Sequence, residues 1–211
     1  MTSELISLEP ATGAELWRGA TSNVATEVAA AHAAWPDWAA RPLAERIALV
    51  ERFAEIARAR YEDMATLIAR ETDKPLWETR TEVEAVINKV AISIQAYADR
   101  TSDRDIAAAP GQRTWVRHKP HGVMAVLGPY NFPAHLPNGH IIPALIAGNA
   151  IVFKPSEKTP AVGAMLVKWL HDAAIPQGVV RLVIGGAEEG RALVAHPNVE
   201  GILFTGSRSE E

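Results

Sequence analysis

Four short segments in the second half of the chain carry side chains that could stabilise an oxyanion or hold a nucleotide. They are residues 128–133 (GPYNFP), 154–157 (KPSE), 185–190 (GGAEEG) and 205–207 (TGS). In the first segment Asn131 offers a neutral amide donor, which suits an oxygen that gains negative charge in a transition state. A single Asn in a proline-flanked turn more often satisfies backbone groups instead. Asn131 is therefore a candidate catalytic residue with a structural alternative.

Lys154 and Glu157 follow an apolar run and form a second candidate pair. A carboxylate at the end of a parallel strand can accept hydrogen bonds from the two hydroxyls of a ribose, and a lysine can steady the same hydroxyls. The negative charge of Glu157 would also repel a 2′-phosphate, which favours NAD over NADP. The alternative for this pair is an ordinary ion pair at the surface.

Glycines and one hydroxyl mark the remaining two segments. Gly186 and Gly190 frame a turn into a helix whose free N–H groups could face a pyrophosphate, although glycines mark turns far more often than phosphates. Gly206 and Ser207 supply a small residue and a hydroxyl donor directly after another apolar run. Because both segments follow a predicted strand, a phosphate contact is favoured over an ordinary turn. This argument is stronger for Ser207 than for the glycines.

The composition excludes several other kinds of chemistry. The 211 residues contain no cysteine, which removes disulfides, thiolate metal sites and a cysteine nucleophile from this stretch of chain. The seven histidines form no HExxH motif, and His135 and His140 fall on different helix faces, so we expect no metal site.

Charge and hydropathy indicate where the protein works. A net charge of -4 without any basic block argues against a nucleic-acid partner. No apolar run reaches the roughly 18 residues that a membrane span needs, and the first ten residues lack the pattern of a signal peptide. We therefore expect a cytoplasmic protein without a membrane partner.

Amphipathic helices account for most of the first hundred residues. Residues 10–13 predict the turn of a short hairpin, and Ser22 or Asn23 predicts the cap of a helix that Pro36 should stop. Apolar repeats continue through Arg60, then up to residues 73–75, and again over 83–97. The polar residues of that last stretch that should face water are Glu82, Glu84, Lys89 and Asp99.

From about residue 113 the pattern changes from helical to extended. After an alternating strand at 114–119, strands are expected at 123–127, 150–153, 179–184 and 202–205, and helices at about 134–147, 160–173 and 187–195. This alternation predicts an α/β fold, with a parallel, doubly wound, Rossmann-like sheet behind an N-terminal helical lead. Ligands of such sheets bind at the carboxyl ends of the strands, where the four segments fall.

Together the four segments resemble the aldehyde dehydrogenase superfamily, and the resemblance covers essentially the whole chain, including ETDKP at 71–75 and RHKP at 117–120. It implies that Asn131 is the oxyanion donor and that the cofactor is NAD. The cofactor contacts that it implies are Pro129, Tyr130, Lys154, Ser156, Glu157, Gly186, Gly190, Gly206 and Ser207. With Tyr130 where most of the family has Trp, residues 128–149 resemble the branch that oxidises a succinylated semialdehyde in arginine catabolism.

Members of this family attack the aldehyde with a cysteine thiolate and hydrolyse the product with a water activated by a glutamate. Both residues follow the Thr-Gly-Ser segment in the family. We therefore expect an amino-terminal portion of the enzyme that is catalytically incomplete by itself. It would be a single NAD-binding domain over 1–211, with a helical lead (1–110), an arm-like strand (113–119) and a nucleotide-binding part (122–207).

The resemblance also bears on assembly. Family members form homo-oligomers through such an arm, and we expect the partner strand of residues 114–119 to come from the absent part of the enzyme. A sheet that stops at its fourth strand is C-terminally incomplete, so it should expose apolar surface and associate poorly.

Two functions of other classes stay open. One is a non-catalytic nucleotide-binding or interaction module derived from the family, and the other is a helical scaffold unrelated to nucleotides. The scaffold leaves the four segments unexplained. A continuation beyond codon 211 that encodes a glutamate and a cysteine would favour the enzyme over the module.

Overall fold

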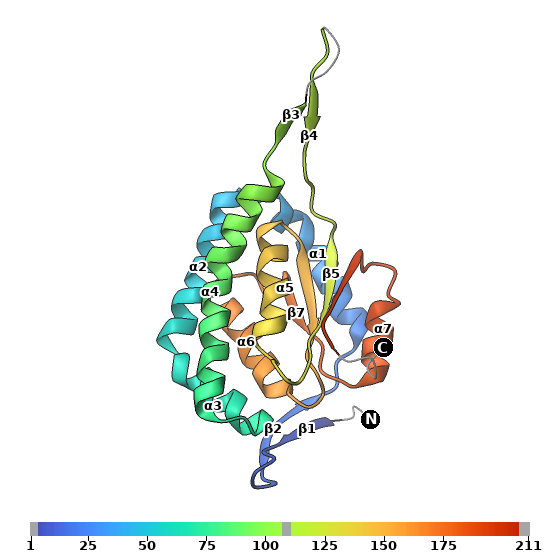
Figure 1. Ribbon diagram of the computed structural model, residues 1–211. Helices are drawn as coiled ribbons and strands as arrows, with labels where there is room; N and C mark the ends of the chain where they lie inside the picture. The colour runs from blue at the N-terminus through green and yellow to red at the C-terminus, as the bar shows by residue number, and fades with distance from the viewer. Residues whose placement is uncertain (1–3, 107–110, 207–211) are drawn as a thin grey trace.

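The computed structural model describes residues 4–106 and 111–206 (Figure 1). Along the chain these residues form an N-terminal hairpin, a group of helices, a projecting two-stranded arm and a parallel sheet with its own helices. The predicted cofactor contact at Ser207 lies outside the described residues.

The hairpin consists of β1 (Glu4–Leu8) and β2 (Glu15–Ala20), which pair antiparallel as the turn residues predict. Gly13 has a φ of +72°, a conformation that glycine adopts without steric cost. The backbone N–H of Glu9 donates to the carbonyl of Ala14 at 2.8 Å and closes the turn.

The first helix, α1 (Val24–Ala40), begins as predicted, because the side-chain oxygen of Asn23 accepts from the N–H of Thr26 at 3.1 Å. The prediction that Pro36 stops it is wrong, since Pro36 lies inside the helix. The last turn is held by Trp38, which is 1% exposed and donates its indole N–H to the carbonyl of Leu145 at 3.2 Å. This packing outweighs the cost of about 3 kcal/mol that an interior proline imposes.

Three more helices follow and overlap the predicted stretches, and the last of them extends beyond 83–97 at both ends. They are α2 (Leu43–Ala59), α3 (Tyr61–Thr72) and α4 (Leu76–Thr101). Asp73 ends α3 in the left-handed conformation, with a φ of +60°. The prediction that Glu82 faces water is wrong, because this residue is only 2% exposed. No helix in the described ranges is long and apolar enough to cross a membrane.

The arm pairs two strands of this chain, β3 (Arg104–Ile106) and β4 (Thr114–Val116), in antiparallel register. It projects from one end of the molecule (Figure 1). One edge of β4 thus pairs with β3 of this chain, and the expected partner strand from the absent part of the enzyme stays a prediction. Only seven residues separate β3 from β4, so closing the loop between them costs little entropy.

The sheet contains four parallel strands in the order β7-β6-β5-β8. Its elements in chain order are β5 (Val123–Leu127), α5 (His135–Ile146), β6 (Ala150–Lys154), α6 (Pro160–Asp172), β7 (Val180–Leu182), α7 (Ala187–Val194) and β8 (Gly201–Phe204). The predicted alternation is thus confirmed, and strand boundaries shift by no more than two residues.

Helices cover both faces of the sheet, which confirms the doubly wound arrangement. On one face Val123, Ala125 and Val152 pack with residues of α1 and α7. On the other face Val126 and Phe153 belong to the larger core that α2, α4, α5 and α6 share. The alternation of inward directions along β5 follows from the two-residue period of a strand.

Strand β8 lies at the edge of the sheet, and β5 is its one neighbour among the described strands. Along β8 the side chains of Ile202 and Phe204 are 46% and 40% exposed. The expected apolar surface is therefore present at this edge.

Candidate functional site

The register of the sheet brings three of the predicted segments to one edge. Leu127, the last residue of β5, pairs with Lys154 on one side and with Phe204 on the other. Because all four strands are parallel, the segments that follow β5, β6 and β8 leave the sheet side by side. The predicted site therefore has a common location at the carboxyl ends of the strands.

The segment after β5 carries Asn131 on an exposed turn. Gly128 anchors the start of this turn, where its N–H donates to the carbonyl of Lys154 at 3.0 Å. A Cβ at Gly128 would lie 3.0 Å from the Phe153 ring, so the close packing favours glycine. Pro129 is buried, whereas Asn131 is exposed and its side chain forms no hydrogen bond with any residue that the structure describes. The turn does not use this amide to satisfy its own backbone groups.

The far end of the same turn is fixed by Glu82 on α4. One carboxylate oxygen of Glu82 accepts the N–H groups of Ala134 at 3.0 Å and His135 at 3.1 Å, at the beginning of α5. Burial raises the pKa of Glu82, although these two amides and the positive charge of Lys74 act in the opposite direction. A carboxylate at the positive end of a helix is electrostatically favourable.

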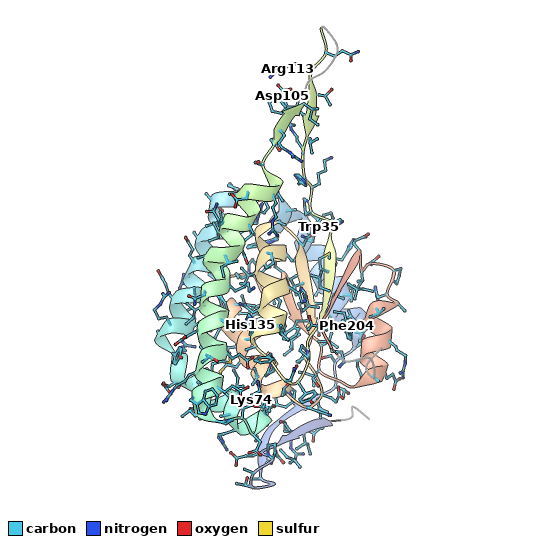
Figure 2. The ribbon with its side chains drawn as sticks, in the orientation of Figure 1. Trp35, Lys74, Asp105, Arg113, His135 and Phe204 are labelled. Atoms are coloured by element: carbon cyan, nitrogen blue, oxygen red, sulfur yellow. The ribbon has the colours of Figure 1, made fainter. Side chains whose placement is uncertain are left out.

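Lys74 ties the turn to α4 from another direction. Its ammonium nitrogen lies 3.8 Å from the second oxygen of Glu82 and 3.2 Å from Glu78. The same nitrogen is 3.6 Å from the ring centroid of Phe132, the residue after Asn131. Figure 2 labels Lys74, which lies just before α4, and His135, at the start of α5. Sequence reasoning missed Lys74 and Glu82 as site residues, because a burial signal for them exists only in the tertiary packing.

The second predicted pair meets a predicted glycine. Lys154 is 6% exposed, and its Nζ lies 3.8 Å from a carboxylate oxygen of Glu157, whose side chain is exposed. A Cβ at Gly190 would contact the Lys154 stem at 3.6 Å. The structure therefore brings Lys154, Glu157 and Gly190 together, and the glycine leaves room beside the lysine.

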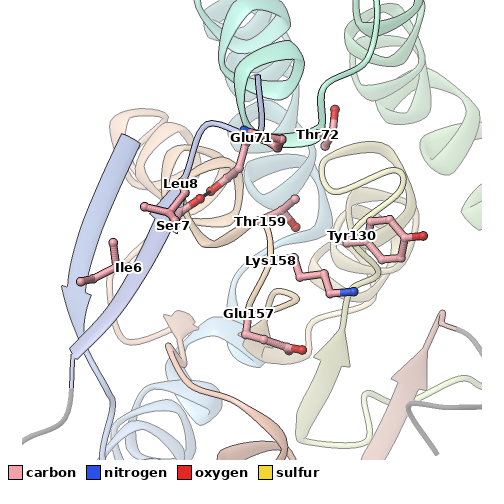
Figure 3. Close-up of a pocket in the computed structure, with 10 residues that line it drawn as sticks. Ile6, Ser7, Leu8, Glu71, Thr72, Tyr130, Glu157, Lys158 and Thr159 are labelled. Atoms are coloured by element: carbon pink, nitrogen blue, oxygen red, sulfur yellow. Dashed lines mark hydrogen bonds between the residues drawn. The ribbon is translucent and has the colours of Figure 1, made fainter. Parts of the chain in front are cut away.

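Ser156 and Tyr130 have different surroundings. Ser156 is buried, and its hydroxyl accepts from the N–H of Lys158 at 3.3 Å, so it stabilises the turn after β6. Tyr130 is exposed, with the Nζ of Lys158 at 4.8 Å from its ring centroid. The side chains of Tyr130 and Lys158 point toward one another in Figure 3.

A pocket of about 420 Å³ lies beside this contact (Figure 3). Its walls come from the N-terminal hairpin, the end of α3 and the segments after β5 and β6. The lining residues include Ile6, Leu8, Glu71, Tyr130, Glu157 and Thr159. Two of the predicted cofactor contacts, Tyr130 and Glu157, thus share one hollow, while Lys154 lies in the interior behind it.

Glu71 caps the beginning of α6 in the same way as Glu82 caps the beginning of α5. Its buried carboxylate accepts the N–H groups of Ala161 at 2.9 Å and Val162 at 2.8 Å, and also the hydroxyl of Ser7 at 2.6 Å. Burial raises the pKa of Glu71, and the three hydrogen bonds oppose that shift. The helical lead therefore supplies an acidic cap to each of the two helices that follow β5 and β6.

The beginning of α7 carries acidic groups of its own beside the N–H groups that were expected to face a pyrophosphate. The N–H of Gly186 donates to the carboxylate of Glu189 at 2.7 Å, and Glu188 adds a second acidic residue to the first turn. A pyrophosphate would have to displace the Glu189 carboxylate to reach Gly186. Gly190 faces Lys154 instead.

The segment after β8 contacts α5. The Nε2 atom of His140 lies 2.8 Å from the hydroxyl oxygen of Thr205, and Gly206 beyond it is exposed. Burial lowers the pKa of both His140 and His135, and the nearby Lys89 lowers them further, so both rings are neutral at pH 7. Across the described ranges no three His, Asp or Glu side chains are grouped as a metal site requires.

Comparisons with known proteins agree with this geometry. The model of the aldehyde dehydrogenase family matches residues 2–210. The N-succinylglutamate 5-semialdehyde dehydrogenase of Sphingopyxis alaskensis is 64% identical over 207 residues, which are 98% of this chain and 43% of that protein. The chain thus spans about two fifths of the length of this relative.

Solved structures show the same likeness. PnpE in complex with nicotinamide adenine dinucleotide superposes with a TM-score of 0.92 at 33% identity, over 98% of this chain and 43% of PnpE. The NADP-dependent glyceraldehyde-3-phosphate dehydrogenase of Bacillus halodurans, complexed with NADP, gives a TM-score of 0.92 at 28% identity, over 98% of this chain and 45% of its own. The chain therefore belongs to the aldehyde dehydrogenase family.

Proposed function

We propose that residues 1–207 form the cofactor-binding part of an NAD-dependent dehydrogenase that oxidises N-succinylglutamate 5-semialdehyde to N-succinylglutamate. The observation that carries this proposal is the meeting of Asn131, Lys154 and Glu157 at one edge of a parallel sheet. The likeness to the Sphingopyxis alaskensis protein supports the choice of substrate.

The residues present fit a nicotinamide dinucleotide. Lys154 lies behind Glu157, and the space that Gly190 leaves beside the lysine would be lost with a larger side chain. Lys154 and Glu157 would hold the hydroxyls of the adenosine ribose, with Gly206 and Ser207 beside a phosphate. The bound cofactor supplies a hydride acceptor. The half-exposed carboxylate of Glu157 favours NAD, because a 2′-phosphate would meet a like charge.

Asn131 supplies the oxyanion donor in this proposal. Its amide is exposed and has no partner among the described residues, so it can donate to an incoming aldehyde oxygen without breaking an existing hydrogen bond. The turn is held at both ends, by Gly128 and by the contacts of Glu82. Such preorganisation makes a donor effective when negative charge develops on the oxygen.

A fusion tests the proposal. It joins residues 1–207 to the part of the Sphingopyxis alaskensis protein that follows the residue aligned with Ser207, and we refer to it as the joined enzyme. It should reduce NAD with N-succinylglutamate 5-semialdehyde. Asn131→Ala should lower kcat about a hundredfold or more and leave NAD affinity nearly unchanged. Glu157→Ser should weaken NAD binding and ease the entry of NADP.

Each variant is the control for the other, because one acts on the chemical step and the other on the cofactor. Normal turnover of Asn131→Ala would show that Asn131 is not the oxyanion donor and has a structural role instead. Binding of NAD without turnover by the unsubstituted joined enzyme would favour a non-catalytic nucleotide-binding module.

A further inference from the structure

The face between α4 and α5 carries a cationic cluster that the proposed chemistry leaves unused. On α4 the residues that contact α5 are Glu82, Val86 and Lys89, which recur at four and three residues and so share one face. Their counterparts on α5 are His135, Asn138 and Gly139. The contacts run in order along the two helices, which lie next to each other in Figure 1.

Lys89 packs beside Gly139, with the end of its side chain against the space in front of this glycine. A Cβ built at Gly139 would lie 3.7 Å from the Cε and 3.9 Å from the Nζ of Lys89. The lysine is half-buried and forms no ion pair with a carboxylate in the described part of the chain. A positive charge is therefore held in place against α5 and still reaches solvent.

His135 lies on the same side of α5, one turn before Gly139. Its Nδ1 is enclosed and has no hydrogen-bond partner among the described residues. A buried nitrogen without an acceptor is more stable as a lone pair than as an N–H group, so the ring proton belongs on Nε2. The half-buried ring thus offers one N–H donor one helical turn before Gly139, the position that the end of Lys89 approaches.

The acidic neighbour of this cluster is already compensated. The Glu82 carboxylate is buried against the first amides of α5 and lies 3.8 Å from Lys74. Glu84, two residues further along α4, accepts from the hydroxyl of Tyr61 at 3.3 Å and so belongs to the contact with α3. An anion that approaches Gly139 therefore meets Lys89 and His135 first.

We propose that Lys89 and His135 form a subsite for a carboxylate of the aldehyde substrate. The inference rests on the proposed function, because N-succinylglutamate 5-semialdehyde carries two carboxylates and an uncharged aldehyde carries none. His135 follows Asn131 by four residues, so a carboxylate held here lies within a short molecule's reach of the oxyanion donor. The ammonium group attracts the carboxylate, and the imidazole N–H orients it through a directional hydrogen bond.

Steady-state kinetics of the joined enzyme test the subsite. Lys89→Met should raise KM for N-succinylglutamate 5-semialdehyde about tenfold or more, leave kcat within about twofold, and leave KM for hexanal unchanged. Lys89→Arg should recover much of the loss. The matched control is Lys168→Met on the exposed side of α6, where the same charge is removed from a pair with Asp172. An equal rise of KM for both aldehydes, or none, would overturn the subsite.

A binding measurement on the 211-residue chain separates this inference from the proposed function, since it needs no turnover. The probe is N-succinylglutamate, and its trimethyl ester, in which all three carboxylates are esterified and uncharged, is the comparison. NMR should show shifts of the Gly139 amide and the His135 ring with the acid alone, and Lys89→Met should abolish them. Shifts that persist in Lys89→Met, or an undisturbed Gly139 in the unsubstituted chain, would refute the subsite even if the joined enzyme were active.

Discussion

Replacement of Glu82 by Ala should destabilise the chain by an amount that the contacts of this residue define. The variant leaves the N–H groups of Ala134 and His135 without an acceptor, at about 1 to 3 kcal/mol for each buried group. It also removes one carboxylate from Lys74, which keeps Glu78 at 3.2 Å. Removal of a carboxylate that is unfavourably desolvated offsets part of this loss of stability. Because breaking a buried pair typically costs 3 to 5 kcal/mol, we expect about 3 kcal/mol.

Urea unfolding of the 211-residue chain measures this loss. With a slope of about 2 kcal/mol per molar urea, the midpoint should fall by about 1.5 M. Glu82→Gln keeps an acceptor oxygen and should lose about 1 kcal/mol. The control is Glu84→Ala on the same helix, whose hydrogen bond to Tyr61 is exposed, and which should cost less than about 0.5 kcal/mol.

Amide hydrogen exchange then locates the effect. The amides of Ala134 and His135 should exchange faster in Glu82→Ala and stay protected in Glu84→Ala. A midpoint for Glu82→Ala that matches the Glu84→Ala control would show that the carboxylate does not hold the Asn131 turn. So would unchanged protection of the two amides.

Two further predictions concern the 211-residue chain. Glu71 has a folded-state pKa raised by burial, so its contribution to stability is complete below its unfolded pKa and is lost as pH rises through the folded value. Urea unfolding between pH 4 and pH 7.5 should therefore show the unsubstituted chain losing stability relative to Glu71→Gln as pH increases; a relative gain would mean that the hydrogen bonds from Ser7 and α6 outweigh burial. Because the 211 residues contain no cysteine, the purified chain should form no NADH from N-succinylglutamate 5-semialdehyde above the buffer background, and steady NADH formation free of host dehydrogenases would contradict the thiolate mechanism.

The sequence alone determined the helices, the four parallel strands and the edge at which the candidate residues gather. These features follow from local periodicity, since a strand repeats every two residues and a helix every 3.6, whatever the rest of the chain does. Once Val123 to Leu127 and Ala150 to Lys154 are parallel strands, the segments after them must leave at the same edge. Asn131, Lys154 and Glu157 were therefore found without coordinates.

Only the tertiary structure decided which polar residues support that edge. The charge of Glu82 on an amphipathic helix predicts that it faces water, yet it is buried, because α5 begins against it with two amides that need an acceptor. Pro36 stays helical because Trp38 beyond it is locked into the core. The hydrogen-bond partners of Glu82 and Trp38 lie 52 and 107 residues away in the chain, so neither contact leaves a pattern in the local sequence. The energy of burying a charge or extending a helix depends on what packs there, so folding settles what periodicity cannot.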